Sequence, residues 1–133
     1  MRYRGEGINI DFDEAMHYFK MAAEKDNYEA IYHIGLMTYH GQAVAADKEK
    51  AADIFKLAAD NGHLNALFNL AMMRLKGDGI PLNKTEGLRL FKILADRDHV
   101  DSMKVYASYL EKGDGIAMNK DEANRYRKLI AEK

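Results

Sequence analysis

The sequence contains no cysteine among its 133 residues. Disulfide bonds, thiolate metal sites and a cysteine nucleophile are therefore excluded. The lack of cysteine is compatible with a reducing compartment such as the cytoplasm, without establishing one. No apolar run approaches the ~20 residues that a membrane-spanning helix needs, and the N-terminus lacks the apolar stretch of a signal peptide. We therefore expect no membrane partner.

The chain also lacks an excess of charge of either sign. It has 20 basic and 21 acidic residues, for a net charge of −1. Proteins that bind nucleic acids usually carry a strong basic excess, so we expect no nucleic-acid partner. Residues 1–63 hold 7 basic and 11 acidic side chains, and the remaining residues hold 13 and 10. This mild asymmetry is too small to specify a partner.

What the sequence has instead is an internal repeat with a period of 36 residues. Three sets of positions that recur in one register, without insertion or deletion, are Gly5, Gly41, Gly77 and Gly113; Asp11, Asp47, Asn83 and Asn119; and Phe19, Phe55 and Phe91. Self-similarity of this length is the signature of a repeat architecture. We interpret residues 1–133 as a single repeat domain, with a partial unit at 1–27 and repeats at 28–63, 64–99 and 100–133.

Each repeat is predicted to form a first helix (helix A), a glycine loop, a second helix (helix B) and a short turn. In the first complete repeat, small and apolar residues at helical spacing predict helix A over roughly Tyr28 to His40. Gly41 is expected to end it, because glycine adopts the left-handed conformation that closes helices. Asp47 is expected to cap helix B, which runs to about Asp60.

Small residues at fixed places predict close packing between helices. Gly35 lies in mid-helix, where glycine costs about 1 kcal/mol relative to alanine, and Ala71 and Ala107 occupy the equivalent positions. The phenylalanines of helix B are expected to fill the space between hairpins. Because one hairpin cannot bury its apolar face alone, the hairpins must stack. The sequence therefore predicts an all-α solenoid of αα-hairpins.

The pattern resembles the Sel-1-like repeats, which are relatives of the tetratricopeptide repeats. The matching residues of two successive repeats are Ala30, Ile34, Gly35, Gly41, Val44, Asp47, Lys50, Ala51, Phe55, Ala58 and Ala59, then Ala66, Leu70, Gly77, Gly79, Ile80 and Pro81. The resemblance covers essentially the whole chain, although Thr38, Arg74 and Leu110 replace the usual tyrosine. It implies a right-handed superhelix that serves as an adaptor in protein complexes.

The two ends of the chain differ. Residues 3–5 match the end of a helix A, and the first helix B, predicted over about residues 12–24, is expected to expose an apolar flank. We therefore expect a fragment of a longer repeat protein, or a flank that another chain covers. At the far end, Arg125, Arg127 and Lys128 put charge on the last helix B, and Arg127 replaces the phenylalanine. A terminal repeat needs such a polar outer face.

In tetratricopeptide-like stacks helix A lines the concave surface, and by that analogy a protein or peptide partner binds there. The candidate binding residues are Tyr32, Leu36, Tyr39, Phe68, Met72, Leu75 and Lys104. Aromatic side chains are rigid anchors in interfaces, and grooves of this kind accept peptides or helices. The alternative is that these side chains pack against neighbouring helices, and the sequence leaves both interpretations open.

No catalytic site, metal or cofactor is expected. His63 and His99 share one repeat position, in the turn before helix A, which favours a structural role. His33 and His40 lie near one helix face, but no carboxylate completes a convincing set of metal ligands. The Gly77–Gly79 segment resembles a phosphate loop only superficially, because the lysine and serine or threonine that follow in such a loop are absent.

The sequence therefore predicts a protein-interaction scaffold that is not an enzyme. The alternative is a structural role, in which stacks join end to end by self-association through the N-terminal flank. An enzyme is the third hypothesis, and a pocket that contains His33 or His40 together with an ordered ligand would support it.

Overall fold

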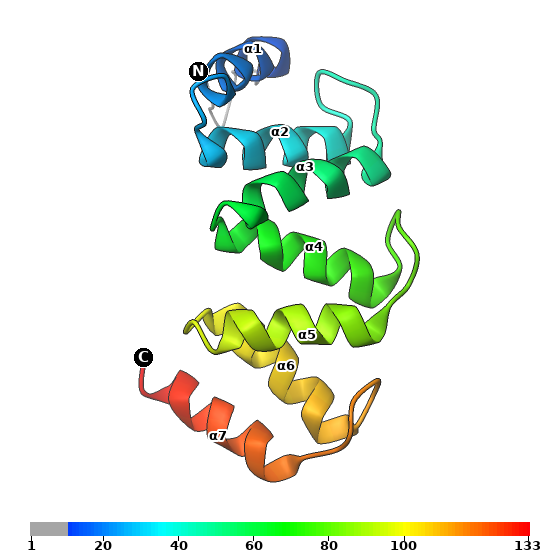
Figure 1. Ribbon diagram of the computed structural model, residues 1–133, viewed down its shortest axis with the longest axis vertical. Coiled ribbons are helices and arrows are strands. Elements are labelled where there is room, and N and C mark those ends of the chain that lie inside the picture. The colour runs from blue at the N-terminus through cyan, green and yellow to red at the C-terminus, as the bar shows by residue number, and fades with distance from the viewer. Residues whose placement is uncertain (1–10) are drawn as a thin grey trace, which may run out of the picture. The chain divides into compact units, whose positions relative to one another are not determined.

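The computed structural model describes residues 11–133, and this part of the chain forms α-helices and no strand (Figure 1). The helices are α1 (Phe12–Ala23), α2 (Tyr28–His40), α3 (Lys48–Asp60), α4 (Leu64–Lys76), α5 (Lys84–Ala95), α6 (Val100–Lys112) and α7 (Lys120–Ala131). The predicted all-α fold is confirmed. Within residues 11–133, every helix is too short or too polar to cross a bilayer.

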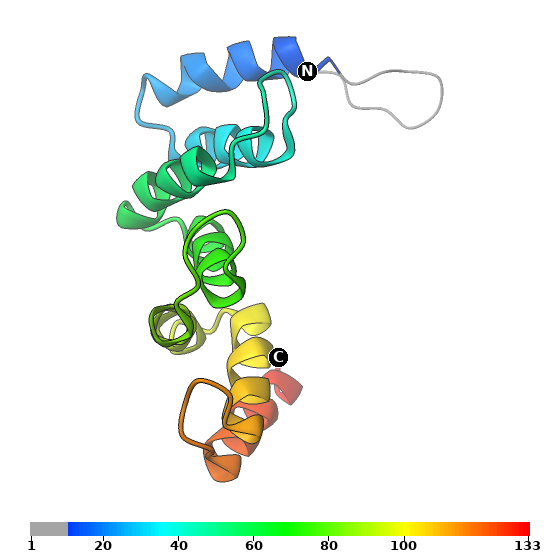
Figure 2. The same ribbon diagram turned by 90° about the vertical axis from the view of Figure 1, so that its right-hand side faces the viewer.

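The helices alternate as the repeat predicts. Helix A corresponds to α2, α4 and α6, and helix B to α1, α3, α5 and α7. The chain divides into two compact units, residues 1–66 and 67–133, with the boundary inside α4. In the first unit α2 packs against both α1 and α3, and in the second α6 packs against both α5 and α7 (Figure 2). The end of a helix A that was predicted at residues 3–5 lies outside the described residues.

Local signals in the sequence set the helix boundaries. The side chains that accept a hydrogen bond from the backbone N–H three residues later, and so cap each helix B, are Asp11, Asp47, Asn83 and Asn119. Gly41 and Gly113 end α2 and α6 in the left-handed conformation, with φ of 75° and 69°. The predicted caps are confirmed, and α2 and α3 have the predicted bounds.

The two equivalent histidines begin the helices that follow them. The Nδ1 atom of His63 accepts the backbone N–H of Ala66 at 3.0 Å, and His99 receives the N–H of Ser102 in the same way at 3.3 Å. Asn27, at the same repeat position, caps α2 with its side-chain oxygen. The predicted structural role of this pair is therefore the role of an N-cap, which satisfies a backbone donor that the helix itself leaves unpaired.

The core includes small and aromatic residues that the repeat brings together. Phe55 and Phe91 are fully buried, as are Ala71 and Ala107. At Gly35, an added Cβ atom would lie only 2.7 Å from Cε1 of Phe55. The small positions therefore allow close approach of the neighbouring helix, as predicted.

The last helix B differs from the prediction in one respect. Arg127 is exposed and donates to Glu111 at 2.7 Å, which gives the expected polar face. The repeat nevertheless keeps a core aromatic one residue earlier. Tyr126 is 1% exposed, packs edge to face on Tyr106, and donates its hydroxyl to Asp96 Oδ1 at 2.8 Å. Leu90, at the same repeat position in α5, is also buried, with 7% of its surface exposed.

Candidate functional site

Helix α2 carries three of the predicted binding residues on one face. Tyr32, Leu36 and Tyr39 are separated by four and three residues, the spacing that aligns side chains along a helix, and all three are half-buried. The ring of Tyr32 stacks on His63, with centroids 4.5 Å apart, and lies 5.9 Å from the ring of Phe55. Part of the Tyr32 ring is therefore used in packing within its own unit, which agrees with the alternative that these side chains pack against neighbouring helices.

Helix α4 presents a similar pair in the second unit. Phe68 and Met72 are half-buried. The Phe68 ring meets Phe91 edge to face at 5.6 Å and lies 5.3 Å from the ring of His99. Lys104, on α6, is exposed. Met72 and Lys104 are thus available at the surface, whereas Phe68 also supports the packing of its own unit.

The prediction for Leu75 is wrong. Its side chain is 1% exposed, so a partner cannot contact it without rearrangement of the core. The cause lies on the next helix, where Gly87 replaces the alanine of the other repeats. A Cβ atom at Gly87 would lie 3.0 Å from the backbone N of Leu75 and 3.1 Å from the carbonyl oxygen of Ala71. Glycine therefore lets α4 approach α5 closely, and Leu75 is drawn into the core.

A carboxylate joins two histidines at the start of α2. The Glu29 carboxylate lies 2.6 Å from Nε2 of His63 and 3.1 Å from Nε2 of His33. Because Nδ1 of His63 accepts a backbone N–H, Nε2 carries the proton in the neutral ring and donates it to Glu29. This hydrogen bond is the main reason that the pKa of Glu29 lies below its ordinary value.

The hydrogen bond from His63 to Glu29 spans 34 residues and fixes the ring on which Tyr32 stacks. Sequence reasoning missed it, although the repeat places Glu29 two residues after the position equivalent to His63. Across residues 11–133, no group of three or more histidine, aspartate or glutamate side chains is arranged to hold a metal ion.

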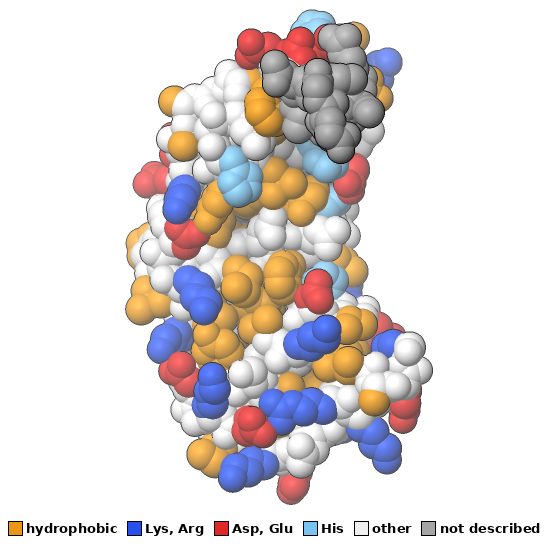
Figure 3. Space-filling model, turned by 180° about the vertical axis from the view of Figure 1, so that it is seen from behind, with side chains coloured by type: hydrophobic (Ala, Val, Ile, Leu, Met, Phe, Trp, Pro, Cys, Tyr) orange, Lys and Arg blue, Asp and Glu red, His pale blue; other side chains and the backbone are white. Residues whose placement is uncertain are grey.

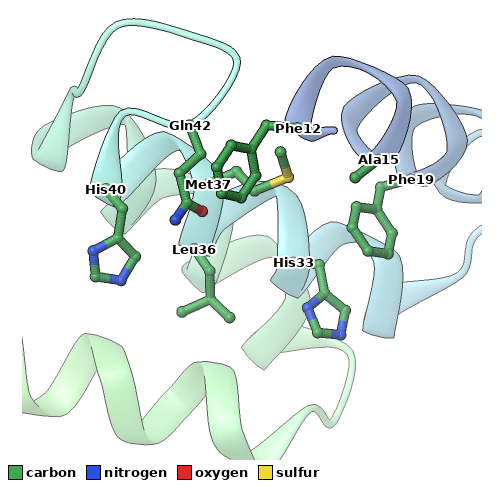
Figure 4. A pocket seen from close by; sticks show the side chains of 8 residues that line it. All are labelled: Phe12, Ala15, Phe19, His33, Leu36, Met37, His40 and Gln42. Carbon is green, nitrogen blue, oxygen red and sulfur yellow. The ribbon is translucent and has the colours of Figure 1, made fainter. Parts of the chain in front are cut away.

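A pocket of about 280 Å³ lies between α1 and α2 (Figure 4). The residues that line it are Phe12, Ala15 and Phe19 from α1, His33, Leu36, Met37 and His40 from α2, and Gln42 from the loop that follows. The Phe19 ring stacks on His33, with centroids 4.9 Å apart. Of the predicted binding residues, only Leu36 lines this pocket.

This pocket contains both histidines of the enzyme hypothesis. Its other described lining residues are apolar apart from Gln42, and none of them carries a hydroxyl or a carboxylate. The lining therefore offers no pair of nucleophile and base. In the space-filling view, hydrophobic side chains lie beside histidines in the upper part of one face of the molecule (Figure 3). The chemistry of this region suits contact with an apolar group.

A second hollow of about 450 Å³ lies in the same unit. Its lining includes Ile31 and Ile34 of α2 together with Ile54 and Leu57 of α3, and Lys20 of α1. None of the predicted binding residues lines this hollow. Its lining thus combines apolar side chains of one helix A and of the helix B that follows it.

Residues 8–111 match the family model described as plant tetratrico peptide repeats. The match covers most of the chain. The chain belongs to the tetratricopeptide-like repeat family. Two solved structures that share this fold are described as a Sel1 repeat protein and as a protein displaying an SLR fold, in agreement with the resemblance seen in the sequence.

The first of these structures is a Sel1 repeat protein from Oxalobacter formigenes, with 23% identity and a TM-score of 0.86 over 96% of this chain and 52% of that one. The second is a protective antigen of uropathogenic Escherichia coli strains that displays an SLR fold, with 28% identity and a TM-score of 0.87 over 96% of this chain and 27% of that one. The repeat protein thus spans about half and about a quarter of their lengths. None of the curated proteins matches it.

These similarities establish an all-α helical repeat solenoid of the Sel-1-like and tetratricopeptide-like type. Repeat proteins of this family are generally protein-interaction scaffolds.

Proposed function

We propose that this repeat protein is a protein-interaction scaffold that binds a peptide or protein through the outward-facing side chains of helix A. The observation that carries the proposal is the incomplete burial of apolar side chains there. Leu36 and Tyr39 on α2, and Met72 on α4, are each half-buried. Exposed apolar surface on a soluble fold commonly marks an interaction site, and aromatic or methionine side chains are enriched in interfaces.

Helix B offers a competing surface, and it defines the control. Met21, Leu57 and Ile93 share one repeat position and are 54%, 52% and 38% exposed. A partner that binds the helix B side would contact these residues instead. The two surfaces can be separated because the helix A residues and the helix B residues belong to different elements in both units.

The test uses two matched double variants. Tyr39→Ala with Met72→Ala alters helix A, and Leu57→Ala with Ile93→Ala removes comparable apolar surface from helix B. Tyr32 and Phe68 are less suitable, because both support core packing. Partners are captured with the wild-type protein and identified by mass spectrometry, and affinities are then measured with the purified partner by calorimetry.

We expect the helix A double variant to weaken binding by at least about tenfold, since two interface side chains of this kind contribute roughly 1–2 kcal/mol or more. The helix B double variant should bind as the wild type does. The opposite pattern, with both variants folded by circular dichroism, would contradict the proposal.

A structural role remains a second proposal, because one observation favours it. Tyr18 on α1 is 60% exposed, whereas Leu90 and Tyr126, at the same repeat position, are 7% and 1% exposed. Burial of this apolar ring by another copy would join stacks through the α1 face. Concentration-dependent assembly in light scattering, abolished by Tyr18→Lys, would support this role, and a monomer at all concentrations would refute it.

A further inference from the structure

The pocket between α1 and α2 has an equivalent position in the second unit, where it is filled differently. Phe12 corresponds to Lys84 and Gln42 to Asp114, each 72 residues later. The Lys84 ammonium donates to Asp114 Oδ1 at 2.8 Å and bridges α5 to the loop after α6. In the first unit this ion pair is replaced by a phenyl ring and an amide, which line an open pocket instead.

Resting on the proposed function, we infer that this pocket receives one apolar side chain of a basic peptide. Its walls are formed by the rings of Phe12 and Phe19 and by the side chains of Leu36 and Met37 (Figure 4). At about 280 Å³ it is below the range of roughly 300–1,000 Å³ that is typical of pockets for drug-sized ligands and cofactors. The pocket has room for a leucine, methionine or phenylalanine side chain, and its apolar lining suits one.

The carboxylates near the pocket indicate which peptide is favoured. Asp11 and Asp13 flank Phe12 in the sequence, and the Glu29 carboxylate lies 3.1 Å from Nε2 of His33, which lines the pocket. Lysine or arginine on either side of the inserted apolar residue is therefore attracted, whereas an acidic peptide is repelled.

The experiment selects short random peptides on the full chain and measures the affinity of the enriched peptides by fluorescence anisotropy. The test variant is Phe12→Lys with Gln42→Asp, which introduces the pair found at Lys84 and Asp114 and should close the pocket. Because this variant changes the start of α1, Leu36→Lys is tested in parallel, since it places a cation at the wall without touching α1. Leu57→Ala on α3 serves as the control.

We expect enriched peptides that carry an apolar residue flanked by lysine or arginine. Their affinity should fall by about tenfold or more in both pocket variants, because the apolar side chain loses its site, and should be unchanged by Leu57→Ala. The amide and methyl signals of Leu36 and Met37 should shift on titration of the wild-type protein in NMR spectra.

Three results would overturn the inference: acidic peptides among those enriched, peptides that bind the folded pocket variants as tightly as the wild type, or no enrichment at all. If peptides bind the wild type and only the helix A double variant, Tyr39→Ala with Met72→Ala, abolishes this binding, the pocket inference fails while the proposed function stands. If binding is lost only with the helix B double variant, the proposed function fails as well.

Discussion

Replacing Gly35 by alanine is expected to destabilise the protein, although alanine is the better helix former. Gly35 lies within α2 and is buried. A Cβ atom there would lie 2.7 and 2.9 Å from Cε1 and Cδ1 of Phe55 and 3.2 Å from Cγ2 of Ile54. Phe55 is 1% exposed, so its ring has little room to move away.

Two effects of opposite sign decide the magnitude. The gain in helix propensity is about 1 kcal/mol, and the cost of overpacking a dense core is about 1–3 kcal/mol. The expected net loss in the free energy of unfolding is therefore about 1 kcal/mol, measured by urea denaturation. In a double-mutant cycle, Phe55→Leu should relieve part of the clash, so that the two substitutions together cost less than the sum of their separate effects.

The exposed position Asn124 in α7 supplies the control for propensity alone. Asn124→Ala should be neutral or slightly stabilising, because no neighbour restricts an exposed side chain. If Gly35→Ala stabilised the protein by as much as propensity predicts, the close approach of Phe55 would not constrain this position, and the account of the core would be wrong.

Three other substitutions test separate contacts. His63→Ala should lower the free energy of unfolding by about 1 kcal/mol through loss of the N-cap. His63→Asn should restore most of this stability, because Asn27 caps α2 at the equivalent repeat position. Gly87→Ala should destabilise more than Gly35→Ala, because its Cβ atom meets backbone rather than a side chain; thermal unfolding ranks the two variants. Tyr126→Phe should cost about 1 kcal/mol at neutral pH. The hydroxyl of Tyr126 lowers the pKa of Asp96, so its contribution is present above the ordinary carboxyl pKa of about 4 and disappears as the pH falls through the lowered value. The stability of Tyr126→Phe should therefore converge with that of the wild type in strong acid.

The sequence predicted the helices closely because their boundaries depend on local chemistry. Gly41 and Asp47 act on the backbone within a few residues, so their effects follow from the sequence alone. The 36-residue period then carried these assignments to the other repeats. The fully buried Phe55 and Phe91 follow from the same register, because equivalent positions meet equivalent neighbours.

The candidate site was less predictable because exposure depends on contacts between helices. Leu75 and Tyr39 occupy the same repeat position, yet Leu75 is buried because Gly87 on another helix admits it. The pocket between α1 and α2 likewise depends on which residues stand at Phe12 and Gln42 in one repeat and not in another. Periodicity identifies shared positions, but it does not predict how exposure differs between equivalent positions.

The central claim is that partners bind the helix A side, and hydroxyl-radical footprinting of the complex with a captured partner tests it most directly. Two methionines provide an internal comparison, because Met72 lies on α4 and Met21 lies exposed on α1. The account predicts that the partner slows oxidation of Met72 and Tyr39 and leaves Met21 and Leu57 unchanged. Protection of Met21 and Leu57, with Met72 and Tyr39 oxidised as fast as in the free protein, would contradict it.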